Sequence, residues 1–130
     1  MTTTGFVETS SYLSGTRQRN TWTCRMHFLG RGSAARVEFN WKKVLQREET
    51  SGDVIGFFHT HPQGLTRPSR RDIKTMRAWC DCLGKPLLCI IGIPYADDTE
   101  IYGYLFRNFR SRGRKVDLIA HAKKQMIFKE

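Results

Sequence analysis

Hydrophobic and polar residues alternate along several stretches of the chain, and the period of the alternation predicts the elements. In Thr21–Leu29 the apolar residues occupy every second position, which is the period of a half-buried strand. Val54–Phe58 is instead a continuous apolar run, typical of a central strand buried on both faces. Further strands are predicted over these ranges: Phe6–Leu13 (ended by Gly15), Arg36–Phe39, Leu87–Ile93 and Ile101–Phe106.

Two other stretches carry apolar residues at helical spacing. The first follows Asn40, a good N-cap, and is expected to end near Ser51-Gly52. The second runs over Ser69–Leu83, and Gly84 supplies its C-terminal stop. Val116–Phe128 mixes helix and strand signals and is left unassigned. The pattern predicts an α+β fold, with helices packed on a mixed or antiparallel sheet.

Composition places the chain among single-domain globular proteins. Its 130 residues, 39% of them hydrophobic, suit one domain over residues 1–130. No apolar run reaches the roughly 18 to 20 residues that a membrane span requires. The first residues lack the pattern of a secretory signal, so a cytoplasmic location is expected. The four cysteines show no CxxC spacing and are interpreted as free thiols.

The excess of positive charge indicates anionic partners. The formal net charge is +10, and its densest run is Arg107–Lys115, which includes one aromatic residue. Nucleic acid or an acidic protein face could dock on such a run. A solvated basic loop is the alternative interpretation.

The strongest chemical signal is His59-Thr60-His61 followed by Ser69 and Asp72. On an extended segment the two imidazoles project to the same side, and Asp72 falls in the first turn of the next helix, where a carboxylate is favoured. Taken alone, Ser69 and Asp72 would be a capping box, and an isolated HxH is more often an ordinary pair of histidines. Together they favour a zinc site with three protein ligands, which leaves a fourth position for water, as catalytic zinc requires.

These residues carry a resemblance to a known family. The stretch HTH, seven residues, then SxxD is similar to the JAMM motif of MPN-domain zinc metalloproteases, whose pattern also contains an upstream glutamate. The resemblance extends over roughly residues 6–107 and is greatest to small bacterial or phage members. It implies a single MPN-like domain with a mixed β-sheet flanked by helices, a cytidine-deaminase-like sandwich. Residues 108–130 would then be a basic C-terminal extension.

The resemblance also implies the position of the glutamate. Val7–Gly15 aligns with a family stretch similar to ETGGxLxG and places Glu8 in that role, although Ser10 and Ser11 replace the two glycines. Glu38 is the second candidate. Two poorer candidates lie on the first predicted helix: Glu48 and Glu49.

The family's chemistry would use one Zn²⁺ per chain, bound by His59, His61 and Asp72. Glu8 would act as general base and Ser69 would hydrogen-bond the oxyanion. Such enzymes cleave peptide or isopeptide bonds after the C-terminal tail of ubiquitin or a ubiquitin-like protein. Residues that the resemblance places beside the substrate are Thr60, Gln63 and Gly64, and the loop Gln63–Pro68 would line its channel.

The implied partners are a ubiquitin-like protein or its conjugates, with a partner subunit or a second copy of the chain as a further expectation. Prokaryotic relatives occur beside ubiquitin-like conjugation systems, including those of antiphage defence. Neither nucleic acid nor a membrane is expected as a partner. Two alternatives stay open: a zinc hydrolase of small peptides or amides, and a non-catalytic MPN scaffold subunit.

Overall fold

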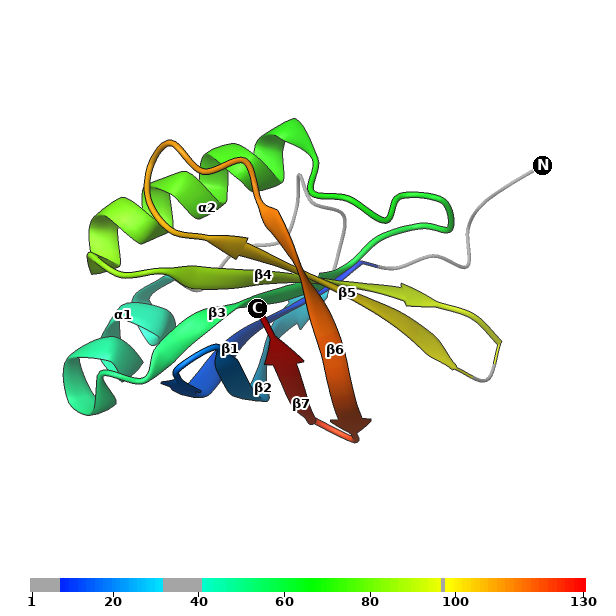
Figure 1. The fold of residues 1–130 in the computed structure, drawn as a ribbon, viewed down its shortest axis with the longest axis horizontal. Coiled ribbons are helices and arrows are strands. Elements are labelled where there is room, and N and C mark those ends of the chain that lie inside the picture. The colour runs from blue at the N-terminus through cyan, green and yellow to red at the C-terminus, as the bar shows by residue number, and fades with distance from the viewer. Residues whose placement is uncertain (1–7, 32–40, 97) are drawn as a thin grey trace.

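The computed structural model describes residues 8–31, 41–96 and 98–130. Within these ranges it contains seven strands and two helices (Figure 1). The strands are β1 (Thr9–Gln18), β2 (Thr21–Arg31), β3 (Val54–Thr60), β4 (Leu87–Pro94), β5 (Thr99–Phe106), β6 (Arg114–Ala122) and β7 (Gln125–Lys129). The helices are α1 (Trp41–Ser51) and α2 (Arg70–Leu83). The strand predicted over Arg36–Phe39 and the predicted N-cap Asn40 fall outside the described residues.

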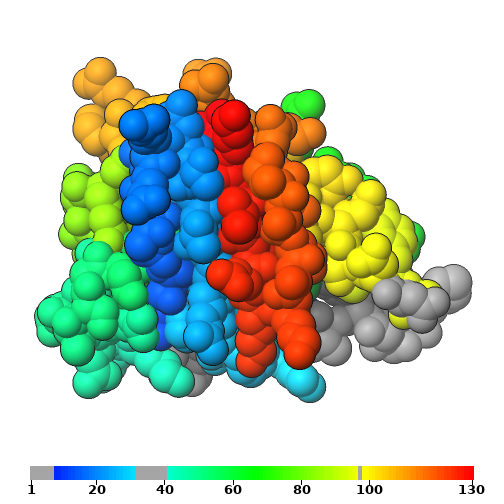
Figure 2. Space-filling model, turned by 60° about the horizontal axis from the view of Figure 1, so that its bottom comes forward, coloured from blue at the N-terminus to red at the C-terminus, as the bar shows by residue number. Residues whose placement is uncertain are grey.

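The seven strands close into a barrel in the order β1-β2-β7-β6-β5-β4-β3, because β1 pairs with both β2 and β3. Neighbouring strands are antiparallel, except that β3 and β4 run parallel. The predicted α+β arrangement, a mixed sheet flanked by helices, is therefore wrong. Figure 2 shows one face of the molecule, where β1, β2, β7 and β6 lie side by side at the surface.

The segment that the sequence left unassigned supplies the strands that close the barrel. β7 pairs with β2 over Thr21–Arg25, and β6 pairs with β5 and β7. β7 alternates between buried and more exposed positions, with Met126 and Phe128 inside. β6 exposes Leu118 and Ile119 to solvent, so its apolar residues follow neither the strand nor the helix period. That irregular pattern is why the segment could not be assigned.

Two hydrophobic clusters stabilise the fold, one inside the barrel and one between its wall and the helices. The inner cluster draws on all seven strands and contains Trp22, Phe58 and Phe128. The outer cluster joins α1 and α2 to the barrel wall and contains Phe57 and Met76. Adjacent residues of β3 thus enter different clusters, which confirms that this strand is buried on both faces.

β1 continues past Gly15 to Gln18, although the sequence predicted that Gly15 ends it. A Cβ atom at position 15 would collide with the carbonyl oxygen of Thr23 in β2. The glycine therefore permits a close approach of two strands and does not terminate one.

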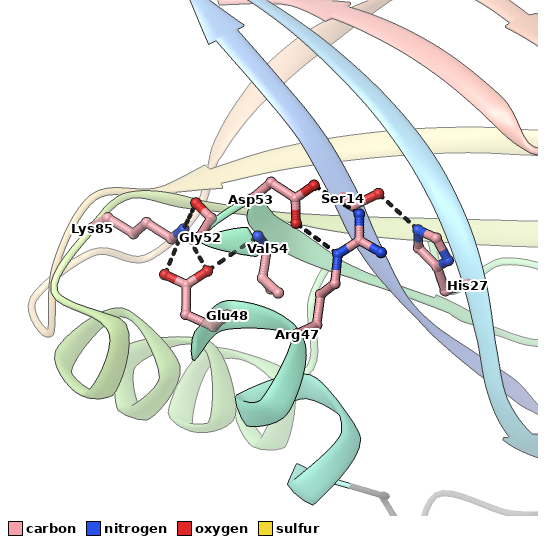
Figure 3. A network of polar contacts seen from close by, with 8 residues as sticks. All are labelled: Ser14, His27, Arg47, Glu48, Gly52, Asp53, Val54 and Lys85. Carbon is pink, nitrogen blue, oxygen red and sulfur yellow. Dashed lines mark hydrogen bonds and ion pairs between the residues drawn. The ribbon is translucent and has the colours of Figure 1, made fainter. Parts of the chain in front are cut away.

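Polar contacts fix α1 against the barrel (Figure 3). Arg47 donates two hydrogen bonds of 2.8 Å to Asp53, just before β3. The carboxylate of Glu48 accepts from Lys85 at 2.8 Å and from the amide of Val54 at 3.1 Å. Because these partners lie at or just before the first residues of β3 and β4, the contacts hold the helix at the start of both parallel strands. Neither helix in the described part of the chain combines the length and apolar character needed to cross a membrane.

Candidate metal centre

The HTH segment lies where β3 leaves the barrel wall. The amide of His61 donates to the carbonyl oxygen of Gly92 in β4 at 2.9 Å, so the chain stays extended just beyond β3. His59 and His61 are alternate residues of this extended segment, and their side chains therefore project to the same side. A loop over residues 62–69 returns the chain to the start of α2.

Three side chains converge at this point: His59, His61 and Asp72. The Nε2 atoms of the two histidines lie 2.8 Å apart. Asp72 Oδ1 lies 3.1 Å from His59 Nε2, and Asp72 Oδ2 lies 3.2 Å from His61 Nε2. His61 is buried, and the other two are half-buried. Three potential ligand atoms from β3, the following loop and α2 thus face one small space.

This donor set fits zinc in both chemistry and spacing. Zinc accepts imidazole nitrogen and carboxylate oxygen, and bonds of about 2.0 to 2.1 Å in a tetrahedron place ligand atoms roughly 3.3 to 3.4 Å apart. The two separations between Asp72 and the histidines, 3.1 and 3.2 Å, lie within a few tenths of an ångström of that value, and the two Nε2 atoms, 2.8 Å apart, lie about half an ångström closer. Small side-chain movements would suffice to place an ion between the three atoms.

The hydrogen bonding of His61 also suits a ligand. Its Nδ1 lies 2.8 Å from the carbonyl oxygen of Leu65, which only accepts hydrogen bonds. The neutral imidazole therefore carries its proton on Nδ1, and the lone pair of Nε2 faces the cluster. Metal-binding histidines usually have such a partner, because it fixes the ring and its tautomer.

Asp72 stays ionised despite its partial burial. Burial opposes its charge, but hydrogen bonds with His59 and His61 and with the amide of Ser69 outweigh this effect and hold its pKa well below the ordinary range. Ser69 and Asp72 also form the predicted capping box: the amide of Asp72 donates to Ser69 Oγ at 3.1 Å, and the amide of Ser69 donates to Asp72 Oδ2 at 2.8 Å. The cap fixes the carboxylate that faces the histidines.

Glu8 lies beside this cluster. It lines a cavity of about 190 Å³ together with His59 and Asp72, and it precedes β1, whose Ser10 pairs with His59. Its negative charge is also among the factors that raise the pKa of His61. In His61, burial favours the neutral ring, but the hydrogen bonds to Asp72 and Leu65 outweigh it.

The other glutamate candidates differ in position. Glu38 falls outside the described residues. Glu48 is engaged with Lys85 and the amide of Val54 on the α1 side of the barrel, and Glu49 is exposed on the same helix. Of the glutamates that the structure describes, Glu8 is the one that lines the cavity beside this cluster.

The three residues predicted to contact substrate do not line the cavity. Thr60 accepts a hydrogen bond from the amide of Thr9 at 2.8 Å and so joins β3 to β1. Gln63 and Gly64 are exposed in the loop between His61 and Ser69. This loop follows His61 directly in the chain. The side chain of Gln63 makes no hydrogen bond or ion pair with the residues that the structure describes.

Sequence reasoning missed several groups around the cluster. Ser10, Arg71 and Thr75 also line the cavity, and the carbonyl of Leu65 orients His61. The helical spacing of Arg71 and Thr75, four residues apart, could have placed these two on one face. The contact between the carbonyl of Leu65 and His61 could not be predicted, because every residue has a backbone carbonyl. Cys89 lines the cavity too, but it does not belong to the group of converging ligand atoms.

Comparison with protein families gives one match. Residues 7–111 match the family Prok-JAB, described as prokaryotic homologs of the JAB domain. The match contains the whole cluster and Glu8, and it ends before β6 and β7. No curated protein matches the chain.

Proposed function

The chain belongs to the prokaryotic homologs of the JAB domain, and from this premise we propose that it is a zinc-dependent peptidase. The observation that carries the proposal is the convergence of His59, His61 and Asp72 beside Glu8. A scaffold has no need for three zinc-compatible donor atoms that meet at the wall of a cavity containing a further carboxylate. His59, His61 and Asp72 would hold the zinc ion, which would supply Lewis-acid chemistry for hydrolysis of an amide.

Two side chains divide the remaining work: Glu8, which lines the cavity, and Ser69, which caps the helix that carries Asp72. Glu8 accepts a proton from the attacking water and later delivers it to the leaving amine. Ser69 already accepts the amide hydrogen of Asp72, but its own hydroxyl hydrogen is available to donate to the developing oxyanion. One serine can thus cap the helix and assist the reaction.

The substrate class that we propose is the C-terminal tail of a ubiquitin-like protein, cleaved from an amine in a peptide or isopeptide bond. This choice follows the resemblance of His59-Thr60-His61, Ser69 and Asp72 to the JAMM motif. The exposed loop that carries Gln63 and Gly64 lies directly between two proposed site residues, His61 and Ser69, and offers a surface against which an extended tail can lie.

Glu8→Gln tests the proposed mechanism. This variant retains about one zinc per chain, because Glu8 is not a ligand, while the rate of cleavage of a ubiquitin-like fusion falls by about 10² to 10⁴. Zinc content and cleavage rate are measured on the same preparation. Glu49→Gln is the matched control, since it makes the same change at an exposed position of α1, and its rate stays at the wild-type level.

The same assay separates substrates. Hydrolysis of short peptides without cleavage of any fusion that carries a ubiquitin-like tail would retain the peptidase and reject the modifier. Equal rates for wild type and Glu8→Gln would reject Glu8 as the base.

A further inference from the structure

One face of α2 is basic and exposed. Arg70, Arg71, Lys74 and Arg77 project from one side of the helix, because Lys74 is four residues after Arg70 and three residues from both Arg71 and Arg77. Arg77 is half-buried, and the other three are exposed. No carboxylate of the described residues lies within ion-pairing distance of Arg70, Arg71 or Lys74. The charge of this face is therefore not neutralised within the described part of the molecule.

One edge of the basic face enters the candidate active site. Arg71 lines the same cavity as His59, Asp72 and Glu8, together with Thr75 on the next turn of the helix. A molecule that presents its scissile carbonyl to the cluster must therefore pass a guanidinium group. Guanidinium is planar and carries several donors, so it binds a carboxylate or a phosphate through two hydrogen bonds.

The opposite edge of the face continues into the loop between β5 and β6. Arg77 Nε donates to the carbonyl oxygen of Ser111 at 2.7 Å, which ties this loop to the helix. Figure 1 shows the loop rising beside α2. The loop contributes Arg110 and Arg112, both exposed. The basic run identified in the sequence is thus an extension of a charged surface that begins at the cavity.

We infer that the substrate carries an acidic segment next to its scissile bond, with one carboxylate side chain bound by Arg71 and others docked along α2 toward the β5–β6 loop. This inference rests on the proposed function. A protein or peptide is favoured over nucleic acid because the group that reaches Arg71 belongs to the molecule whose amide is cleaved. The surrounding charge also accelerates the encounter with an acidic substrate, in a manner that salt suppresses.

The experiment uses two fluorescent peptides that share one scissile sequence and differ only in glutamate against glutamine at the flanking positions. Both are acetylated and amidated, so that side chains alone supply carboxylates. Binding is measured by anisotropy with the Glu8→Gln protein, with and without zinc. The acidic peptide binds at least about tenfold more tightly, as expected for one charge-assisted hydrogen-bonded pair. Adding Arg71→Gln removes most of this preference.

Three further variants, the first of them a control, sharpen the result. Lys42→Gln removes one exposed charge from α1, far along the sequence from the cavity, and leaves the preference unchanged. Lys74→Gln weakens binding of the acidic peptide and reduces its dependence on salt. Arg71→Lys restores part of the preference, because the charge returns without the two-pronged geometry.

The outcomes distinguish failure of this inference from failure of the proposed peptidase function. A preference for the acidic peptide without hydrolysis of either peptide supports the acidic-ligand site and counts against the peptidase. Equal hydrolysis and equal binding of both peptides supports the peptidase and overturns this inference. Tighter binding of a single-stranded oligonucleotide of the same charge, unaffected by Arg71→Gln, also overturns it and makes the basic face a nucleic-acid surface.

Discussion

Two aspartates lie at opposite ends of β3, and both contact nitrogen atoms at short distance, yet their surroundings differ. Asp53 accepts two hydrogen bonds of 2.8 Å from the guanidinium of Arg47, so a carboxylate and a cation satisfy each other. Asp72 faces two imidazole nitrogens that lie only 2.8 Å from each other. The neutral ring of His61, whose Nδ1 donates to the carbonyl oxygen of Leu65, points the lone pair of Nε2 into the shared space. The first arrangement is complete without an ion, whereas the second has the donor atoms that a cation requires.

Asp72→Ala and Asp53→Ala are expected to differ most, in their content of bound zinc. Asp72→Ala loses one of three ligands, and bound zinc falls from about one per chain to near zero, with loss of activity. Asp53→Ala retains its zinc. Metal analysis after gel filtration measures both. Zinc also raises the Tm of the wild type and of Asp53→Ala, since a ligand present at about 1,000 times its Kd contributes about 4 kcal/mol.

Asp72→Asn refines this test, because an asparagine side chain can still accept the hydrogen bond from the amide of Ser69. The cap then survives while the charge is lost. Zinc content equal to the wild type in this variant would show that the carboxylate is a cap alone.

Ser69→Ala and Ser69→Gly separate the two roles of the serine, with an intermediate effect. Alanine at an N-cap costs about 1 kcal/mol of stability, and glycine costs only a few tenths. Both lack the hydroxyl donor, so both lower kcat by about 10² to 10³. Thermal unfolding and kcat are compared for the pair. An activity loss that follows stability, and so spares the glycine variant, would remove Ser69 from the reaction.

Asp53→Asn produces the smallest effect, and it appears as a change in pH dependence. The hydrogen bonds from Arg47, reinforced by its charge, lower the pKa of Asp53 below its ordinary value of 3.8 and outweigh partial burial. A lowered pKa stabilises the fold above the ordinary value, and this contribution is lost as pH falls through the folded-state pKa. The Tm of Asp53→Asn is therefore lower than wild type at pH 7 and falls less below about pH 4. Parallel curves for the two proteins would contradict the ion pair.

Sequence reasoning predicted the convergence of His59, His61 and Asp72, because the information that brings them together is local. The alternation of His59 and His61 after a buried strand, and the helix start that contains Asp72, each depend on a few neighbouring residues. The capping box at Ser69 followed from the same short range. Glu8 required the family resemblance, since nothing in the residues around it distinguishes it from other glutamates.

The barrel could not be predicted in this way, because closure depends on pairing between distant strands. β7 pairs with β2, about 100 positions earlier in the chain. No feature of the sequence Gln125–Lys129 indicates that β2 is its neighbour. The exposed Leu118 and Ile119 further obscured β6. The sequence assigned no role to Arg71, because its position in the cavity depends on how α2 packs against the barrel.

Zinc K-edge X-ray absorption on the purified protein tests the central claim most directly. A single ion held by His59, His61 and Asp72 predicts one zinc per chain, two imidazole ligands and oxygen donors, all at about 2.0 to 2.2 Å. The two imidazoles give a multiple-scattering signal that falls by half in His59→Ala, if that variant binds zinc at all. A sulfur shell near about 2.3 Å, or a protein that takes up no zinc, would contradict the account.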